Sequence, residues 1–286
     1  PADFNGTDSF RVEVRDGQYE DSVMVIVTVD PVDDAPRAAD DYLILVPNDG
    51  GTPLLVDVLA NDTEVDGQTM QLDAVGAPSG GGTAVIATDQ ISYTTNLAEN
   101  QAETVSYTVT DGVLTDTAVL HVSMVEGVAA GQPGDTIIAA NIGISNTIDL
   151  ILDIPANVTA DDEQVSFVLR QIDMTGEPPQ GFKFAGLAFA LEIYVDGVLV
   201  TSSFALDSPI RLTIAYSEAD VAHIGRGDDE LMLAFWDGSD WLPDGITVVE
   251  RDTANNQLVV EIDHLTDFAL FGKDMMTVYL PMIVSP

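Results

Sequence analysis

Residues 9–29 read SFRVEVRDGQYEDSVMVIVTV, and residues 104–124 repeat the pattern as TVSYTVTDGVLTDTAVLHVSM, at an offset of about 95 residues. In each copy apolar residues alternate with polar ones on both sides of an Asp-Gly pair, as at Val12, Val14, Val23 and Val25 of the first copy. Alternation with a period of two indicates strands with one buried face, and Asp-Gly between two such runs indicates a hairpin. The sequence therefore predicts two hairpins, at a spacing that suits one β-sandwich per repeat.

The second hairpin is preceded by further strand-like runs, whereas the first follows Pro1 after only a few residues. The runs are residues 42–46, 54–58, 70–75, 84–87 and 91–94. Together with the hairpin they predict an antiparallel sandwich over residues 37–126. Because an isolated hairpin is marginally stable, we expect residues 1–36 to be the C-terminal part of an incomplete domain plus its linker. Upstream sequence or a neighbouring molecule would complete it.

The composition changes at residues 127–134, where Gly, Ala and Pro predict a linker. Strand-like segments recur over residues 135–272 and predict a second β-rich domain. Ser217, followed by acidic residues, predicts one helical turn there. Residues 273–286 read as an apolar terminal strand that could pair with the sheet edge of another subunit.

The chain carries 48 acidic and nine basic residues, for a formal net charge of −39. Such a surface repels phosphate backbones and anionic lipid head groups, so we expect neither nucleic-acid binding nor binding to membrane surfaces. The absence of cysteine excludes disulfides, thiolate catalysis and Cys-ligated metals. The most apolar stretch, residues 184–200, is interrupted by Glu192, Asp196 and Gly197, so no membrane insertion is expected.

Three phrases resemble the tandem cadherin-like (Ig-like) repeats of large bacterial surface adhesins, in the order that family shows. They are ADFNGTDSF at residues 2–10, PVDDAP at 31–36 and DVLANDTEVDG at 57–67. Residues 157–272 are similar to β-domains near the C-termini of bacterial surface proteins. The resemblance implies an all-β fold, with tandem Ig-like or cadherin-like sandwiches followed by a C-terminal β-rich domain, and a location outside the cell.

Oxygen-bearing side chains gather near the boundary between the first hairpin and the sandwich. Calcium prefers about six to eight such oxygens, so it is the expected cofactor. The candidate ligands are Asp33, Asp34, Asn61, Asp62, Glu64, Asp66 and Asp111, with Asp40 and Asp41 as weaker ones. Gln68 stands where the family often has an acidic residue, and this departure counts against a calcium site at that loop. The alternative is a solvated acidic turn in a chain rich in carboxylates.

Trp236 and Trp241 flank a turn, Asp-Gly-Ser-Asp, that would bring both indoles to one end of a hairpin. They form either a carbohydrate-binding surface or a packed aromatic pair. Catalysis is not expected, because the three histidines are far apart in the sequence and no Ser-His-Asp order supports a nucleophile.

These observations favour an extracellular structural or adhesive protein of a bacterial cell surface, as a stalk, filament or surface-coat component. Its expected partners are other copies of itself, in a homo-oligomer or filament, other surface proteins, or glycans. The alternative is a carbohydrate-binding module of a larger secreted enzyme.

Overall fold

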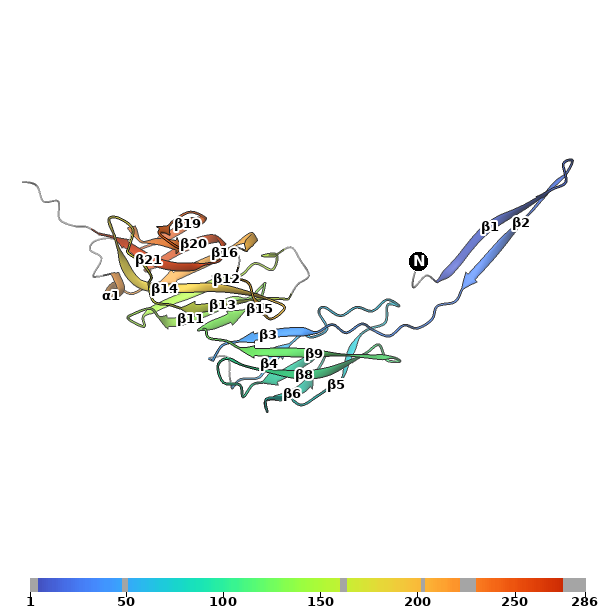
Figure 1. The fold of residues 1–286 in the computed structure, drawn as a ribbon, viewed down its shortest axis with the longest axis horizontal. Coiled ribbons are helices and arrows are strands. Elements are labelled where there is room, and N and C mark those ends of the chain that lie inside the picture. Colours follow the sequence, from blue (N-terminus) through green and yellow to red (C-terminus); the bar gives the residue numbers. More distant parts are fainter. Residues whose placement is uncertain (1–4, 48–50, 160–163, 202–203, 222–229, 275–286) are drawn as a thin grey trace, which may run out of the picture.

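The computed structural model describes residues 5–47, 51–159, 164–201, 204–221 and 230–274. It is built almost entirely of strands, in three parts that follow one another along an elongated molecule (Figure 1). The terminal strand expected over residues 273–286 lies outside the described residues from residue 275 on. Among the described residues, no helix is long and apolar enough to cross a membrane.

The first part is the hairpin of β1 (Gly6–Arg15) and β2 (Glu20–Val29), which pair antiparallel. Its turn is closed by Asp16, whose Oδ1 accepts hydrogen bonds from the backbone N–H groups of Gln18 and Tyr19, at 2.9 and 2.8 Å. In Figure 1 this hairpin, in dark blue, stands apart from the other strands.

The second part, here called the middle sandwich, contains two sheets with strand orders β3-β9-β8-β5 and β4-β7-β6. Its strands are β3 (Asp41–Leu45), β4 (Leu54–Val56), β5 (Gln71–Val75), β6 (Thr83–Ala87), β7 (Gln90–Thr94), β8 (Gln101–Thr110) and β9 (Thr115–Met124). The alternation read from the sequence is confirmed, since Val105, Tyr107 and Val109 are buried in the core between the sheets.

One pairing in the middle sandwich departs from the expected antiparallel arrangement. β3 runs parallel to β9, from Asp41 opposite Leu120 to Leu45 opposite Met124. Parallel neighbours need a long connection between them, and here the rest of the middle sandwich supplies it.

The third part, here called the C-terminal sandwich, packs a seven-stranded sheet on a five-stranded one. The larger sheet has the order β10-β13-β14-β21-β17-β18, with β15 beside β14, and the smaller has the order β11-β12-β16-β20-β19. The larger sheet contains β10 (Ala129–Gly131), β13 (Val165–Gln171), β14 (Phe182–Val195), β15 (Val198–Leu199), β17 (Met232–Trp236), β18 (Trp241–Leu242) and β21 (Asp267–Lys273). The smaller contains β11 (Thr136–Ile142), β12 (Ile148–Asp153), β16 (Ala205–Ala215), β19 (Ile246–Asp252) and β20 (Gln257–His264). Phe167, Phe189 and Phe268 are fully buried between the two sheets.

Residues 127–134, expected to be a linker, are instead partly built into the C-terminal sandwich. β10 lies within this stretch and pairs with β13, and Ala129 is buried. The small residues that suggested a chain break allow this strand to lie close against its neighbours. The predicted helical turn is confirmed as α1 (Glu218–Val221), where Ser217 Oγ accepts a hydrogen bond from Asp220 N at 3.3 Å.

Candidate functional site

The linker between β2 and β3, residues 30–40, lies alongside the acidic loop, residues 61–68. Two backbone hydrogen bonds hold them together, from Arg37 N to Thr63 O at 2.8 Å and from Thr63 N to Arg37 O at 3.1 Å. Ala39 N donates to Asp62 Oδ1 at 2.8 Å, and Asn61 Nδ2 donates to the Asp40 carbonyl at 3.1 Å. Segments some 25 residues apart in the sequence therefore form one surface.

Four side chains, those of Asp33, Glu64, Asp66 and Gln68, hold this surface together. Asp34 N donates to Asp66 Oδ2 at 2.7 Å, and Gln68 Nε2 contacts Asp33 Oδ1. The Glu64 carboxylate accepts from the backbone N–H groups of Asp66 and Gln68, at 2.9 and 2.8 Å. The alternating acidic residues of the loop thus have a structural role, since the carboxylates of Asp62, Glu64 and Asp66 each accept a hydrogen bond from a backbone N–H.

Asp111 lies apart from these contacts, in the turn between β8 and β9. Its Oδ1 accepts hydrogen bonds from Val113 N and Leu114 N, both at 2.7 Å. The structure thus gathers six of the seven predicted ligands along the linker and the acidic loop, and it assigns Asp111 to the hairpin turn.

Four oxygens among these residues are buried and have no hydrogen-bond partner within the described residues. They are Asn61 Oδ1, Asp62 Oδ2, Gln68 Oε1 and Asp111 Oδ2. Buried polar atoms normally have a partner, so each can accept a donor or a cation. Burial raises the pKa of Asp62, and the nearby Asp116 and Asp57 carboxylates raise it further. A cation beside Asp62 would relieve that cost.

The oxygens present suit calcium in kind, because it binds carboxylate and amide oxygens together. In the described ranges, however, no three Asp, Glu or His side chains come together as a metal cluster. The unpaired oxygens of the acidic loop are mixed in kind, since Asn61 and Gln68 offer amide oxygens and Asp62 offers a carboxylate oxygen. Gln68, which the sequence counted against calcium, contributes one of the unpaired oxygens.

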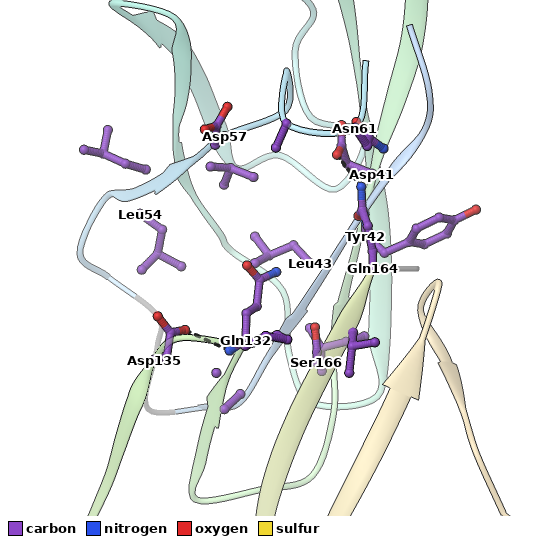
Figure 2. Close-up of a pocket in the computed structure, with 18 of the residues that line it drawn as sticks. Asp41, Tyr42, Leu43, Leu54, Asp57, Asn61, Gln132, Asp135, Gln164 and Ser166 are labelled. Carbon is purple, nitrogen blue, oxygen red and sulfur yellow. Dashed lines mark hydrogen bonds between the residues drawn. The ribbon is translucent and has the colours of Figure 1, made fainter. Parts of the chain in front are cut away.

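A cleft of about 830 Å³ lies where the middle and C-terminal sandwiches meet (Figure 2). Asp57, Asn61 and Leu54 line it from the middle sandwich, and Gln132 and Ser166 line it from the C-terminal sandwich. Gln132 N donates to Asp135 Oδ2 at 2.8 Å on this wall.

Asp41 lies at the centre of a hydrogen-bond network beside the cleft. It is only 4% exposed, and its two oxygens accept from Gln164 Nε2 at 2.6 Å and from Tyr107 Oη at 2.7 Å. The Tyr107 hydroxyl is also 2.6 Å from the Ala39 carbonyl. Burial raises the pKa of Asp41 to about 6, although both hydrogen bonds act to lower it. Sequence reasoning named Asp41 only as a weak calcium ligand and missed Gln164 and Tyr107.

Apolar contact completes the junction between the two sandwiches. Ile44 and Val46 pack against Val168 of β13, and all three are buried. Gly127 lies between them, since a Cβ at this position would be 2.5 Å from Val46 Cγ1 and 2.8 Å from Val168 Cγ1. Beside the cleft, the junction thus contains a tightly packed apolar contact in which only glycine fits at residue 127.

The two tryptophans form the packed aromatic pair. Trp241 is 4% exposed, its Nε1 donates to the Thr175 carbonyl at 2.8 Å, and its ring lies 5.4 Å from that of Phe271. Trp236 lies 5.3 Å from Trp241 and is covered by Gly176, where a Cβ would be 2.6 Å from Trp236 Cη2. The Trp241 ring therefore does not reach the surface that a stacked sugar would need.

Comparisons with known proteins agree with this architecture in the middle of the chain. No curated protein sequence matches the chain. Two solved structures of the endo-fucoidan hydrolase MfFcnA4 of glycoside hydrolase family 107, one of them a variant, align with 76% of this chain at 8% and 9% identity and TM-scores of 0.23 and 0.24. The aligned region spans 33% of their length. The structure PcdhgB3 EC1-4 aligns with 91% of this chain and 75% of its own, at 10% identity and a TM-score of 0.27.

At TM-scores this low, the three alignments carry no argument about the fold or the function. The sequence comparison is more specific, because residues 33–123 match the family model of the bacterial Ig domain. These limits include most of the linker, the acidic loop and the strands of the middle sandwich, except for the last residue of β9. The middle sandwich is therefore an Ig-like domain, similar to the bacterial Ig domain.

Proposed function

We propose that this chain is part of an extracellular structural or adhesive protein of a bacterial cell surface, where it serves as a stalk, filament or surface-coat component. The observation that carries the proposal is the packed and hydrogen-bonded junction between the middle and C-terminal sandwiches. Asp41 with Gln164, and Val46 with Val168, hold two β-sandwiches in one fixed relation. A fixed relation between successive domains is what a spacer needs in order to transmit position and force.

The role proposed is mechanical and interfacial rather than catalytic. A net charge of −39 keeps an exposed polymer soluble and attracts divalent cations. Its partners are other copies of the chain, other surface proteins or glycans, which the exposed sheet edges would contact.

The test is antibody labelling of intact cells of the bacterium that makes the protein, with antibodies raised against residues 32–274. Labelling without permeabilisation is expected, together with weaker attachment or clumping of cells that lack the gene. Labelling that needs permeabilised cells would overturn the proposal. Restoring the gene supplies the control for the loss of attachment.

We further propose that calcium binds between the linker and the acidic loop. The support is the set of buried, unpaired oxygens on Asn61, Asp62 and Gln68. A cation there would tie residues 33–39 to the loop and stiffen the approach to the middle sandwich. The ion supplies no chemistry beyond this crosslink.

Isothermal titration with calcium chloride tests this site directly. Asp62→Asn should lower the affinity at least about tenfold, because the new N–H₂ group can turn toward the cation while its oxygen still accepts from Ala39 N. Asp89→Asn, in the exposed turn between β6 and β7, is the matched control and should leave the affinity unchanged. Saturation at 100 times Kd should stabilise the protein by about 2.7 kcal/mol. An absence of both binding heat and stabilisation would show that calcium does not bind here.

The alternative, a carbohydrate-binding module of a larger secreted enzyme, relied on two exposed indoles. Since Trp241 is buried, no observation in the described residues favours this alternative over the structural role.

A further inference from the structure

The hairpin β1–β2 has one mainly apolar face and one mainly polar face, although Met24 and Ile26 also lie on the polar face. Arg11, Glu13 and Arg15 lie on the polar face, where Arg15 forms ion pairs with Glu13 at 3.1 Å and with Glu20 at 3.0 Å. The other face carries Phe10, Val12, Val14, Val23, Val25, Val27 and Val29. This apolar face is open to solvent, with Phe10 54%, Val14 67% and Val23 60% exposed.

The hairpin is a structural copy of β8–β9, strand for strand. β1 and β8 are both ten residues long, as are β2 and β9, and their limits differ by the offset found in the sequence. Phe10 faces Val25 just as Val105 faces Leu120. The turns match as well, since Asp111 accepts from Val113 N and Leu114 N as Asp16 does from Gln18 N and Tyr19 N.

The positions that are open in the first hairpin are buried in its copy. The counterparts of Phe10, Val12 and Val14 are Val105, Tyr107 and Val109, which are 0%, 1% and 0% exposed. Three neighbours bury them: β3 beside β9, β5 beside β8, and the sheet of β4, β7 and β6 across the core. The apolar face of β1–β2 therefore presents apolar residues at the same positions as the face of β8–β9 that these neighbours bury.

We propose that β1–β2 is the closing hairpin of a further Ig-type sandwich. Its five other strands lie outside residues 1–286, ahead of the hairpin in the same polypeptide. One of them pairs in parallel with β2, a second pairs antiparallel with β1, and a three-stranded sheet covers Phe10, Val12 and Val25. The order along the chain follows from the copy, where β3 to β7 all precede β8 and β9.

A second copy of this chain is less suited to cover the apolar face of β1–β2. In the middle sandwich the place for such a hairpin is already filled by β8 and β9. Two hairpins packed face to face would offer only two strands of ten residues each. At about 3.3 Å per residue and about 4.8 Å per strand, each face covers about 320 Å². The total of about 640 Å² is below the roughly 1,000 Å² that a stable interface needs. It would also leave both edges of each hairpin unpaired.

The proposal rests on the packing of this hairpin and is independent of the proposed function. Amide hydrogen exchange tests it, on residues 1–286 and on the natural polypeptide extended upstream by about 100 residues, the size of one Ig-type domain. In the extended chain, exchange in β1 and β2 should slow at least about a thousandfold relative to residues 1–286. Exchange in β8 and β9 should be equal in the two proteins and serves as the internal reference.

Paired variants of the extended chain separate the two faces. Phe10→Asp should abolish the protection of β1 and β2, whereas Ser9→Asp, on the opposite face, should retain it. Fast exchange of the hairpin in the extended chain would overturn the proposal, as would equal loss of protection in both variants. Protection in residues 1–286 that rises with protein concentration would also overturn it, because a second copy would then be the partner.

Discussion

Gln164 joins the two sandwiches through a single amide group that binds twice. Its Nε2 donates to Asp41 Oδ1 at 2.6 Å, and its Oε1 accepts from Tyr42 N at 2.6 Å. Both partners belong to the start of β3, more than 100 residues earlier in the chain. The amide thus satisfies one buried donor and one buried acceptor of the middle sandwich at the point where the C-terminal sandwich covers them.

Replacing this amide should weaken the junction. Gln164→Ala leaves Asp41 Oδ1 and Tyr42 N without these partners, and we expect the free energy of unfolding to fall by about 1–3 kcal/mol. Chemical denaturation measures the change. Gln132→Ala, on the wall of the same cleft, is the control and should stay within about 0.5 kcal/mol of the parent. Equal losses in both variants would contradict the role given to Gln164.

Asp41 should make the protein more stable in mild acid. Because its pKa is raised from 3.8 to about 6 on folding, the folded protein binds the proton more tightly than the unfolded chain. This contribution is complete below pH 3.8 and disappears as the pH rises through 6. Between pH 5 and pH 8 it amounts to about 1.4 kcal/mol in favour of pH 5.

The measurement is the denaturation midpoint at the two pH values, with EDTA present so that calcium does not contribute. Asp41→Asn keeps the shape of the group and removes its proton equilibrium. The variant should therefore lose this part of the difference between pH 5 and pH 8, while other carboxyl groups with raised pKa, such as Asp62, still contribute. The charged and titratable groups facing Asp41 are Tyr107, Asp62 and Asp40, and both aspartates also disfavour its ionised form. A pH dependence that is unchanged in Asp41→Asn would assign it entirely to other groups.

Gly127→Ala should strain the junction, since the new methyl would be 2.5 Å from Val46 Cγ1. Overpacking of this kind costs about 1–3 kcal/mol. Val46→Ala removes the atom concerned, so the double variant should be more stable than the sum of the two single changes predicts. Strict additivity of the changes in the free energy of unfolding would show that there is no steric conflict between residues 127 and 46.

Trp241→Ala should lower the stability of the C-terminal sandwich by about 3–5 kcal/mol, as expected for a buried tryptophan. Thermal unfolding measures it, and Trp241→Phe should recover much of the loss because it keeps contact with Phe271. If Trp241→Ala instead left stability unchanged and removed binding on a glycan array, the carbohydrate-binding alternative would be favoured.

The sequence was sufficient for features that depend on local patterns. Alternation at Val105, Tyr107 and Val109 predicted which residues enter the core, and Asp-Gly predicted the turns. β10 was missed because Ala129 and Gly131 read as a chain break, and only pairing with β13 makes them a strand. The parallel pairing of β3 with β9 leaves no local signal either, since period-two alternation is the same in both directions.

The candidate site was predicted in part. The acidic loop and the linker were singled out correctly as neighbours, because the resemblance placed their residues at one boundary. The junction was not found, since Gln164 is an ordinary polar residue whose partners are distant in sequence. Asp41 offered a signal only in retrospect, as a carboxylate in a strand whose other residues are apolar.

The parallel pairing of β3 with β9 determines how the middle sandwich meets tension. The chain enters at Asp41, at one end of this pair, and leaves at Met124, at the other end. A pull on the two ends of the domain therefore draws the two strands in opposite directions along their own axes. The bonds between them are loaded in shear, all together, and must break as a group rather than unzip one by one.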